Sequence, residues 1–226
     1  MIEELAEIFN LLAKSDYEDR IKSMNDHKSQ TIQTYNKIAP KYSDSHFTHF
    51  WVEEFEKFKD YITGQKVLDI GCGAGRDAVV FVNNGFDYTG IDASEGMLKV
   101  AQERVPDGKF KQMDFYHLEF PDNTFDCFWA AASFLHVPKS DARILIKEAK
   151  RVIKPEGVGF IAIKKKTDKD EGIISEDKYG GIARYFSFYD VDEFKQILET
   201  CDLDVLEVIE HTEDEGTQWL CYFVKK

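Results

Sequence analysis

A glycine-rich loop directly after a short apolar segment is the feature that most narrows the folds open to this chain. The segment at 66–70 has the sequence Lys-Val-Leu-Asp-Ile, and Gly-Cys-Gly-Ala-Gly follows at 71–75. Glycine adopts positive φ angles without steric cost, so this loop can turn sharply and pass close to a ligand. If the loop joins a buried strand to a helix, the free N–H groups of the first helical turn attract polar or anionic groups.

Strand and helix patterns alternate along the rest of the chain. Apolar, β-branched or aromatic runs predict seven strands, at 66–70, 86–91, 109–113, 124–132, 158–163, 203–210 and 218–224. Helices are expected among them at 74–84, 94–105 (capped by Ser94), 140–153 and 191–201. This order is typical of the α/β class: a doubly wound, mostly parallel, Rossmann-like seven-stranded sheet with helices on both faces. Ligands of such sheets bind beyond the carboxyl ends of the strands.

The first 62 residues show helical patterns instead. One helical face is expected to carry Ile2, Leu5, Ile8, Phe9 and Leu12. Further helices are expected at 29–41 and 51–62. We therefore divide the chain into an N-terminal helical extension at 1–62 and a domain at 63–226. The extension either covers the ligand site or forms a dimer surface, and the chain is expected to be a monomer or a homodimer.

The charge and the cysteines exclude several classes of function. A formal net charge of −13 repels phosphate, so neither nucleic acid nor an anionic membrane is an expected partner. An acidic N-terminus and the lack of any apolar run of about 18 residues favour a cytoplasmic protein. The four cysteines and six histidines show no metal-ligand spacing, so no metal is expected.

Two further strand ends carry acidic residues. Asp92 lies 17 residues beyond Gly75, at the end of the second predicted strand, where a carboxylate can accept both hydroxyls of a ribose. The alternative role for Asp92 is a turn or capping aspartate before Ser94. The third strand is followed by Asp114 and Phe115, a pair that can hydrogen-bond the edge of an aminopurine and stack on its ring.

Together these segments resemble the class I S-adenosylmethionine-dependent methyltransferases, of the small-molecule type. The similar segments lie in the family's order at 67–75, 90–97, 114–115, 125–129, 135–137 and 145–157, with a further one upstream at 35–42. The turn at 155–159 departs from the family's usual Pro-Gly-Gly. Cys201 and the two residues after it stand where a Gly-Phe is common.

The resemblance implies that S-adenosylmethionine is the cofactor. It places Gly71 and Gly73 under the methionine part, with Asp69 holding the loop and the ammonium group. The full set of implied cofactor contacts is Tyr35, Tyr42, Asp69, Gly71, Gly73, Gly75, Arg76, Asp92, Ala93, Met97, Asp114, Phe115 and Ala131. For the two tyrosines, simple packing on the helical face that carries Ala39 is the alternative.

Methyl transfer needs alignment of the reacting atoms and exclusion of water, and it needs a base only when the acceptor holds a proton. His136 is the candidate base, with a helix-start histidine bonded to backbone as its alternative. Arg184 and Tyr185 are the candidates to recognise or activate the acceptor. They lie in the long connection at 164–187, which is expected to be a lid or a solvated flap.

The resulting hypothesis is a methyltransferase that acts on an O, N or S nucleophile of a small molecule. The segment after the fourth strand lacks both the Asn/Asp-Pro-Pro-aromatic motif and the paired glutamates of nucleic-acid and protein-arginine methyltransferases. A cofactor-binding regulator without turnover is the alternative. An NAD-linked reductase is weakened by Arg76, which stands where a dinucleotide fingerprint has its third glycine.

Overall fold

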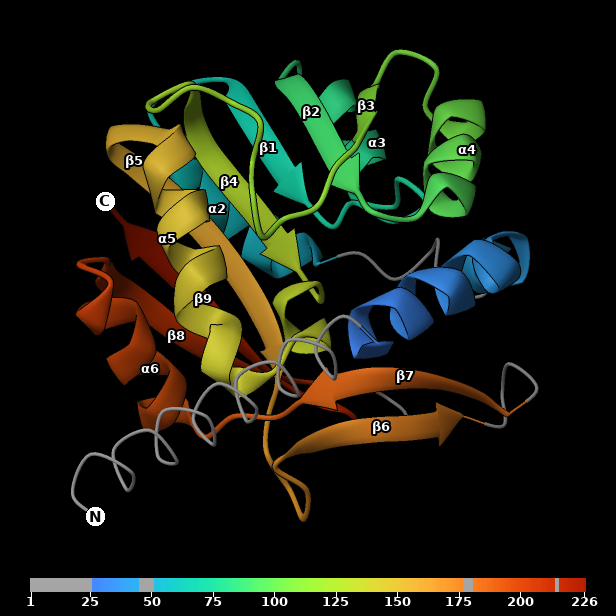
Figure 1. Ribbon diagram of the computed structural model, residues 1–226. Helices are drawn as coiled ribbons and strands as arrows, with labels where there is room; N and C mark the ends of the chain where they lie inside the picture. The colour runs from blue at the N-terminus through green and yellow to red at the C-terminus, as the bar shows by residue number, and fades with distance from the viewer. Residues whose placement is uncertain (1–25, 45–50, 177–180, 214–215) are drawn as a thin grey trace, which may run out of the picture.

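The computed structural model describes residues 26–44, 51–176, 181–213 and 216–226. Its main sheet has seven strands: β1 (Lys66–Ile70), β2 (Asp87–Asp92), β3 (Lys109–Gln112), β4 (Phe125–Ala131), β5 (Ile153–Lys164), β8 (Asp204–Thr212) and β9 (Gln218–Lys225). They are arranged in the order β3-β2-β1-β4-β5-β9-β8 (Figure 1). The first five run parallel, and β9 runs antiparallel to both neighbours. The predicted mostly parallel, doubly wound sheet is confirmed.

The register of the central strands sets the position of the glycine loop. Ile70 at the end of β1 pairs with Ile91 of β2, so the loop that follows β1 starts beside Asp92. On the other side, Asp69 pairs with Trp129 of β4, which brings the end of β4 alongside the same loop. The chain changes direction of winding between β1 and β4, and this is the switch point at which such sheets bind ligands.

Helices cover both faces of the sheet. They are α2 (Val52–Tyr61), α3 (Ala78–Asn83), α4 (Glu95–Arg104), α5 (Ala142–Val152) and α6 (Val191–Thr200). In Figure 1, α5 and α6 lie in front of the sheet and α2 lies behind it. The α2 face is aromatic: Phe58 packs edge-on against Trp129, which stacks on Phe160 with 3.9 Å between ring centroids. No helix in the described parts of the chain combines the length and the apolar character needed to cross a membrane.

The helix after the glycine loop is shorter than predicted. It begins at Ala78 instead of Ala74. Gly73 and Gly75 have φ angles of +53° and +80°, which a right-handed helix does not contain, so the loop continues to Asp77. Ser94, in contrast, caps α4 as predicted, because its hydroxyl accepts a hydrogen bond from the backbone N–H of Met97 at 3.2 Å.

A hairpin and an N-terminal helix complete the described structure. The connection at 164–187, for which the sequence predicts a lid or a solvated flap, contains the antiparallel strands β6 (Glu171–Glu176) and β7 (Ile182–Ser187). The N-terminal helix (residues 26–44, blue in Figure 1) includes the predicted helix at 29–41. The predicted helical face from Ile2 to Leu12 lies outside the described residues.

Candidate functional site

The glycine loop is pinned to the second strand. The backbone N–H groups of Gly71 and Cys72 both donate to the carbonyl of Ile91, at 2.8 and 2.9 Å. Gly71 has a φ angle of +76°, and a Cβ atom there would lie 2.4 Å from the Cβ of Ser133. Glycine is therefore the residue that this position requires for both its conformation and its close approach to the segment after β4.

Asp92 joins the loop to the start of α4. Its carboxylate accepts hydrogen bonds from the backbone N–H groups of Gly73 at 2.9 Å and Ser94 at 2.8 Å. Burial raises the pKa of this carboxyl, and the N–H donors of Ser94 and Gly73 oppose that rise. The carboxylate thus lies at the edge of the pocket with its orientation fixed by backbone groups on both sides.

Buried polar groups support the loop from below. Asp69 accepts a hydrogen bond from the hydroxyl of Tyr88 at 2.7 Å, and burial together with nearby Asp77 raises its pKa well above the usual range. Asp77 pairs with Arg76 through two hydrogen bonds of 2.5 and 3.0 Å. Asp77 also accepts from the indole N–H of Trp129 at 2.9 Å. Asp69 itself does not line the pocket.

The end of the third strand supplies a carboxylate that has a partner on the N-terminal helix. Lys28 forms an ion pair with Asp114, and its ammonium lies 4.9 Å from the ring centre of Tyr116. The other oxygen of Asp114 accepts from the backbone N–H of Tyr116 at 3.1 Å. Phe115 and the buried Met97 add apolar surface to this side of the pocket.

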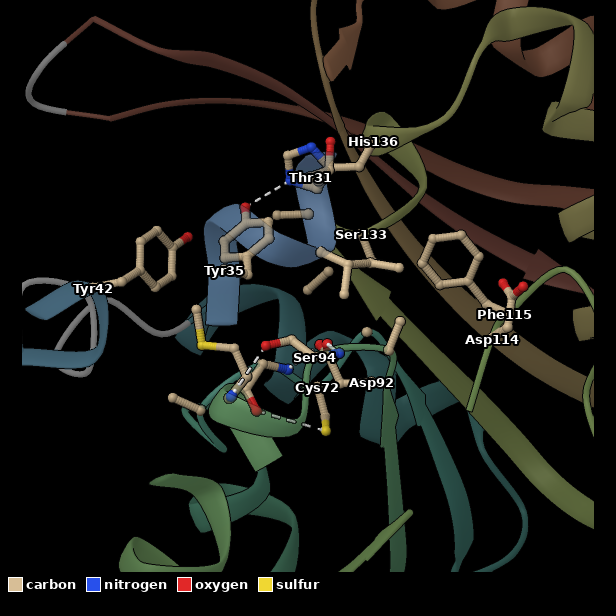
Figure 2. A pocket seen from close by; sticks show the side chains of 18 of the residues that line it. Thr31, Tyr35, Tyr42, Cys72, Asp92, Ser94, Asp114, Phe115, Ser133 and His136 are labelled. Carbon is tan, nitrogen blue, oxygen red and sulfur yellow. Dashed lines mark hydrogen bonds between the residues drawn. The ribbon is translucent and has the colours of Figure 1, made fainter. Parts of the chain in front are cut away.

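The N-terminal helix forms a roof over the pocket and is tied to it by a chain of hydrogen bonds. Figure 2 shows Tyr35 on this helix with its hydroxyl directed to His136, 2.7 Å from Nε2. Arg184 donates to the same hydroxyl at 2.6 Å, so the tyrosine donates in turn to the histidine. The other ring nitrogen of His136 lies 2.7 Å from the carbonyl of Tyr185, to which it donates.

This hydrogen-bond chain defines the state of His136. Burial, with the nearby charge of Arg184, lowers the pKa of the imidazole to about 3. His136 is therefore neutral at pH 7, with Nδ1 protonated and both nitrogens hydrogen-bonded. Arg184 and Tyr185 are buried on β7, where they contact Tyr35 and His136. The Tyr185 side chain lies next to Glu171.

Most of the predicted site residues line one pocket. The predicted residues that line it are Tyr35, Tyr42, Gly71, Gly73, Arg76, Asp92, Ala93, Met97, Asp114, Phe115, Ala131 and His136. Four other predicted residues are absent from its lining: Asp69, Gly75, Arg184 and Tyr185.

Sequence reasoning missed several lining residues. Lys28, Thr31 and Ile32 line the pocket from the same helix as Tyr35. They stand seven, four and three residues before Tyr35, and that helical spacing would have placed them on its face. Ser133, which also lines the pocket, carried no such signal, because its position follows from the pairing of β4 with β1.

The fold and the site define a Rossmann-like α/β protein with a ligand pocket at the switch point of its sheet. Residues 67–157 match the family described as methyltransferase domain. The methyltransferase GfsG of Streptomyces halstedii is 30% identical over 170 residues, which are 71% of this chain and 60% of GfsG. The chain spans between 32% and 63% of the length of the other curated relatives compared.

Solved structures show the same fold. A methyltransferase from Aquifex aeolicus has a TM-score of 0.64 and 25% identity, over 84% of this chain and 97% of that one. A second is 1,6-didemethyltoxoflavin-N1-methyltransferase from Burkholderia thailandensis, solved with 1,6-didemethyltoxoflavin and S-adenosylhomocysteine. It has a TM-score of 0.60 and 16% identity, over 99% of this chain and 89% of that one. The segment at 67–157 belongs to this methyltransferase-domain family, and the chain has the fold of the S-adenosylmethionine-dependent methyltransferases.

Proposed function

We propose that this protein binds S-adenosylmethionine and transfers its methyl group to a small-molecule acceptor by in-line displacement. The observation that carries the proposal is the position of the Asp92 carboxylate in the pocket, next to the glycine loop. A carboxylate at the end of β2 suits the two hydroxyls of a ribose. When bound, the cofactor supplies a methyl group activated by a positively charged sulfur.

The other lining residues fit an adenosyl ligand. Met97 and Phe115 offer apolar surface to a purine ring, and Asp114 offers an acceptor to its amino group. Arg76 and Tyr42 also line the pocket and are proposed to face the charged amino-acid end of the cofactor. Asp69 is proposed to act by holding the loop, because it bonds Tyr88 beneath the pocket.

The roof is proposed to align the acceptor and to exclude water. Tyr35, Thr31 and Ile32 cover the pocket from the N-terminal helix, so the extension at 1–62 contributes to the site that the domain at 63–226 builds. Relatives named demethylmenaquinone methyltransferase, and the toxoflavin enzyme above, act on small molecules. On this ground we propose a small-molecule acceptor for this chain as well.

The state of His136 bears on the class of acceptor. Both of its nitrogens are hydrogen-bonded and its pKa is lowered to about 3, so it takes up a proton poorly in this arrangement. The arrangement therefore favours acceptors whose nucleophile needs no strong base at pH 7, such as a neutral amine, a thiolate or an acidic enol or phenol. Arg184 and Tyr185 are proposed to position His136 and Tyr35.

The test is turnover with S-adenosylmethionine carrying a labelled methyl group and a panel of small amines, thiols and phenols. Release of S-adenosylhomocysteine together with a labelled acceptor is the expected result. Tight binding of the cofactor without any transfer, across the panel and in cell extract, would instead support the alternative of a cofactor-binding regulator. Failure to bind the cofactor would contradict both.

A further inference from the structure

The three lysines at the end of β5 and directly after it differ in their charged partners. Lys165 forms an ion pair with Glu210 at 2.6 Å, and Lys166 forms one with Asp170 at 3.0 Å. The ammonium of Lys164 forms no hydrogen bond and no ion pair with any residue that the structure describes. Lys164 is also partly exposed. Its charge is therefore available to a ligand, whereas its two neighbours are already engaged.

Aromatic rings and a second cation lie around Lys164. Its Nζ atom lies 4.4 Å from the ring centre of Phe186 and 5.9 Å from that of Trp219. The guanidinium of Arg184 lies 5.0 Å from the centre of the same Phe186 ring, and we call Lys164 and Arg184 the cation pair. Burial and the charge of Arg184 lower the pKa of Lys164 to about 8, while Glu213 opposes that shift. Because like charges held close together repel, a bound anion stabilises such a pair.

Lys164 stands at the edge of the sheet where ligands bind. It is the last residue of β5, and the carboxyl ends of parallel strands form the ligand-binding edge of such sheets. Two residues earlier, the carbonyl of Ala162 accepts a hydrogen bond from the backbone N–H of Ala132, which lines the pocket. The pairing of β4 with β5 therefore places Lys164 next to the wall of the pocket that follows β4.

The cation pair adjoins the roof side of the pocket. The Phe186 ring, which both cations contact, has its centre 4.8 Å from that of the His136 ring. Arg184 also donates to the hydroxyl of Tyr35 at 2.6 Å. Figure 2 shows Tyr35 and His136 across the pocket from Asp92, the proposed ribose acceptor. The cation pair therefore borders the part of the pocket that the proposed function gives to the methyl acceptor.

The charge of the whole molecule makes this local arrangement informative. With a formal net charge of −13, the chain repels small anions at long range. Attraction of an anion to the pocket must therefore come from cations close to it, because Coulomb attraction falls with distance. The positively charged sulfur of the proposed cofactor adds to the same local potential.

We infer that the methyl acceptor is a small organic anion and that Lys164 binds its negatively charged group, with the buried Arg184 adding positive charge. This inference rests on the proposed function and names the class of its acceptor. A lysine ammonium suits a carboxylate or a phosphate alike, because it is a compact charge with three N–H donors. Lys164 is then a binding residue that selects the acceptor and keeps its proton throughout.

The experiment compares Lys164→Met with Lys165→Met in the full chain. A small-molecule cell extract is separated at pH 7 by anion exchange into a retained, anionic fraction and an unretained one. Each fraction is then incubated with S-adenosylmethionine carrying a labelled methyl group. The anionic fraction is expected to contain the acceptor. At low acceptor concentration Lys164→Met should be about tenfold slower than wild type, and Lys165→Met should stay within about twofold.

Further arms identify the anion and separate acceptor binding from other effects. Phosphatase treatment of the anionic fraction abolishes methylation if the anion is a phosphate and leaves it unchanged if it is a carboxylate. Lys164→Arg keeps the charge and should retain at least about half of the wild-type rate. Every variant should bind S-adenosylhomocysteine within about twofold of wild type by calorimetry. Lys164→Met should melt no lower than wild type, because it removes a repelling charge; if it folds poorly, Lys164→Gln replaces it.

Three results would overturn the inference. They are methylation of the unretained fraction alone, equal rates for Lys164→Met and Lys165→Met, and a loss by Lys164→Met that Lys164→Arg shares in full. If neither fraction is methylated although S-adenosylhomocysteine binds to the wild-type chain, the proposed function fails and this inference fails with it.

Discussion

The floor and the roof of the pocket are built from contacts of very different range. In the floor, Gly73 bonds Asp92 and Asp69 bonds Tyr88, and each pair is 19 residues apart in the chain. In the roof, Tyr35 bonds His136 across 101 residues and Arg184 across 149. The β1–α3–β2 unit supplies the glycine loop and Asp92 of the floor, whereas the roof needs the N-terminal helix, the segment after β4 and the β6–β7 hairpin together.

This difference separates two roles. The floor carries Asp92, the proposed ribose acceptor, which is held by the backbone N–H groups of Gly73 and Ser94. The roof carries side chains that bind one another, so its geometry depends on the whole fold. Substitutions in the floor should therefore act mainly on cofactor affinity, and substitutions in the roof mainly on stability and closure.

The largest effect is expected from Asp92→Ala in the floor. It removes the proposed ribose acceptor and should weaken S-adenosylhomocysteine binding at least tenfold and up to about 100-fold, measured by calorimetry. Asp87→Ala, at the exposed start of the same strand, is the control and should bind normally. Equal affinity of Asp92→Ala and wild type would remove Asp92 from the site.

Tyr35→Phe removes a hydrogen-bonding hydroxyl from the roof and leaves the floor residues unchanged. Loss of the hydroxyl leaves both Arg184 and His136 without this partner, so the free energy of unfolding should fall by about 1–3 kcal/mol, measured by urea denaturation. Tyr61→Phe, whose hydroxyl bonds the partly exposed Glu207, is the control and should cost less than about 1 kcal/mol. A tenfold loss of cofactor affinity without loss of stability would contradict the division of roles.

The pH dependence of stability tests the same hydrogen-bond chain. The pKa of His136 is lowered to about 3 in the folded state. Between about pH 3 and pH 6.5 the imidazole is therefore neutral in the folded chain and protonated in the unfolded chain. Stability should therefore fall as the pH drops below about 6.5, by up to about 1.4 kcal/mol per pH unit from this residue. His136→Gln should have a flatter profile in that range. If His136→Gln and the wild type lose stability with the same slope, the pKa of His136 is not lowered in the folded chain.

The smallest effect is expected where roof and floor meet. Lys28 on the N-terminal helix occupies one oxygen of Asp114, the carboxylate proposed to hold the adenine amino group. Lys28→Ala should free that oxygen and strengthen S-adenosylhomocysteine binding about two- to fivefold. Lys37→Ala, on the exposed side of the same helix, is the control. Weaker binding by Lys28→Ala would mean that the lysine supports the ligand instead of competing for Asp114.

The fold and the floor were predictable because their signals are local. The apolar run at 66–70, the glycines after it and Asp92 lie within one strand-helix-strand unit, and each has a physical reason to be where it is. The start of α3 was misplaced because the glycine loop extends further than its sequence indicates. The site roles themselves remain predictions.

The roof was not predictable in the same way. The strands β6 and β7 pair with each other over a short stretch, and the sequence of this connection predicts only a lid or a solvated flap. The hydrogen-bonded state of His136 depends on Tyr35, Arg184 and Tyr185, which no spacing in the sequence connects. The exception is the N-terminal helix, where Lys28 and Thr31 share a face with Tyr35 and helical periodicity alone would have joined them.

Calorimetric titration of the full chain with S-adenosylmethionine, S-adenosylhomocysteine and NADH in parallel tests the central claim most directly. Micromolar binding of the two sulfur ligands and none of NADH is the predicted result. Binding of NADH, or failure of both sulfur ligands in a chain shown to be folded, would contradict the assignment of the pocket to an adenosyl cofactor of methyl transfer.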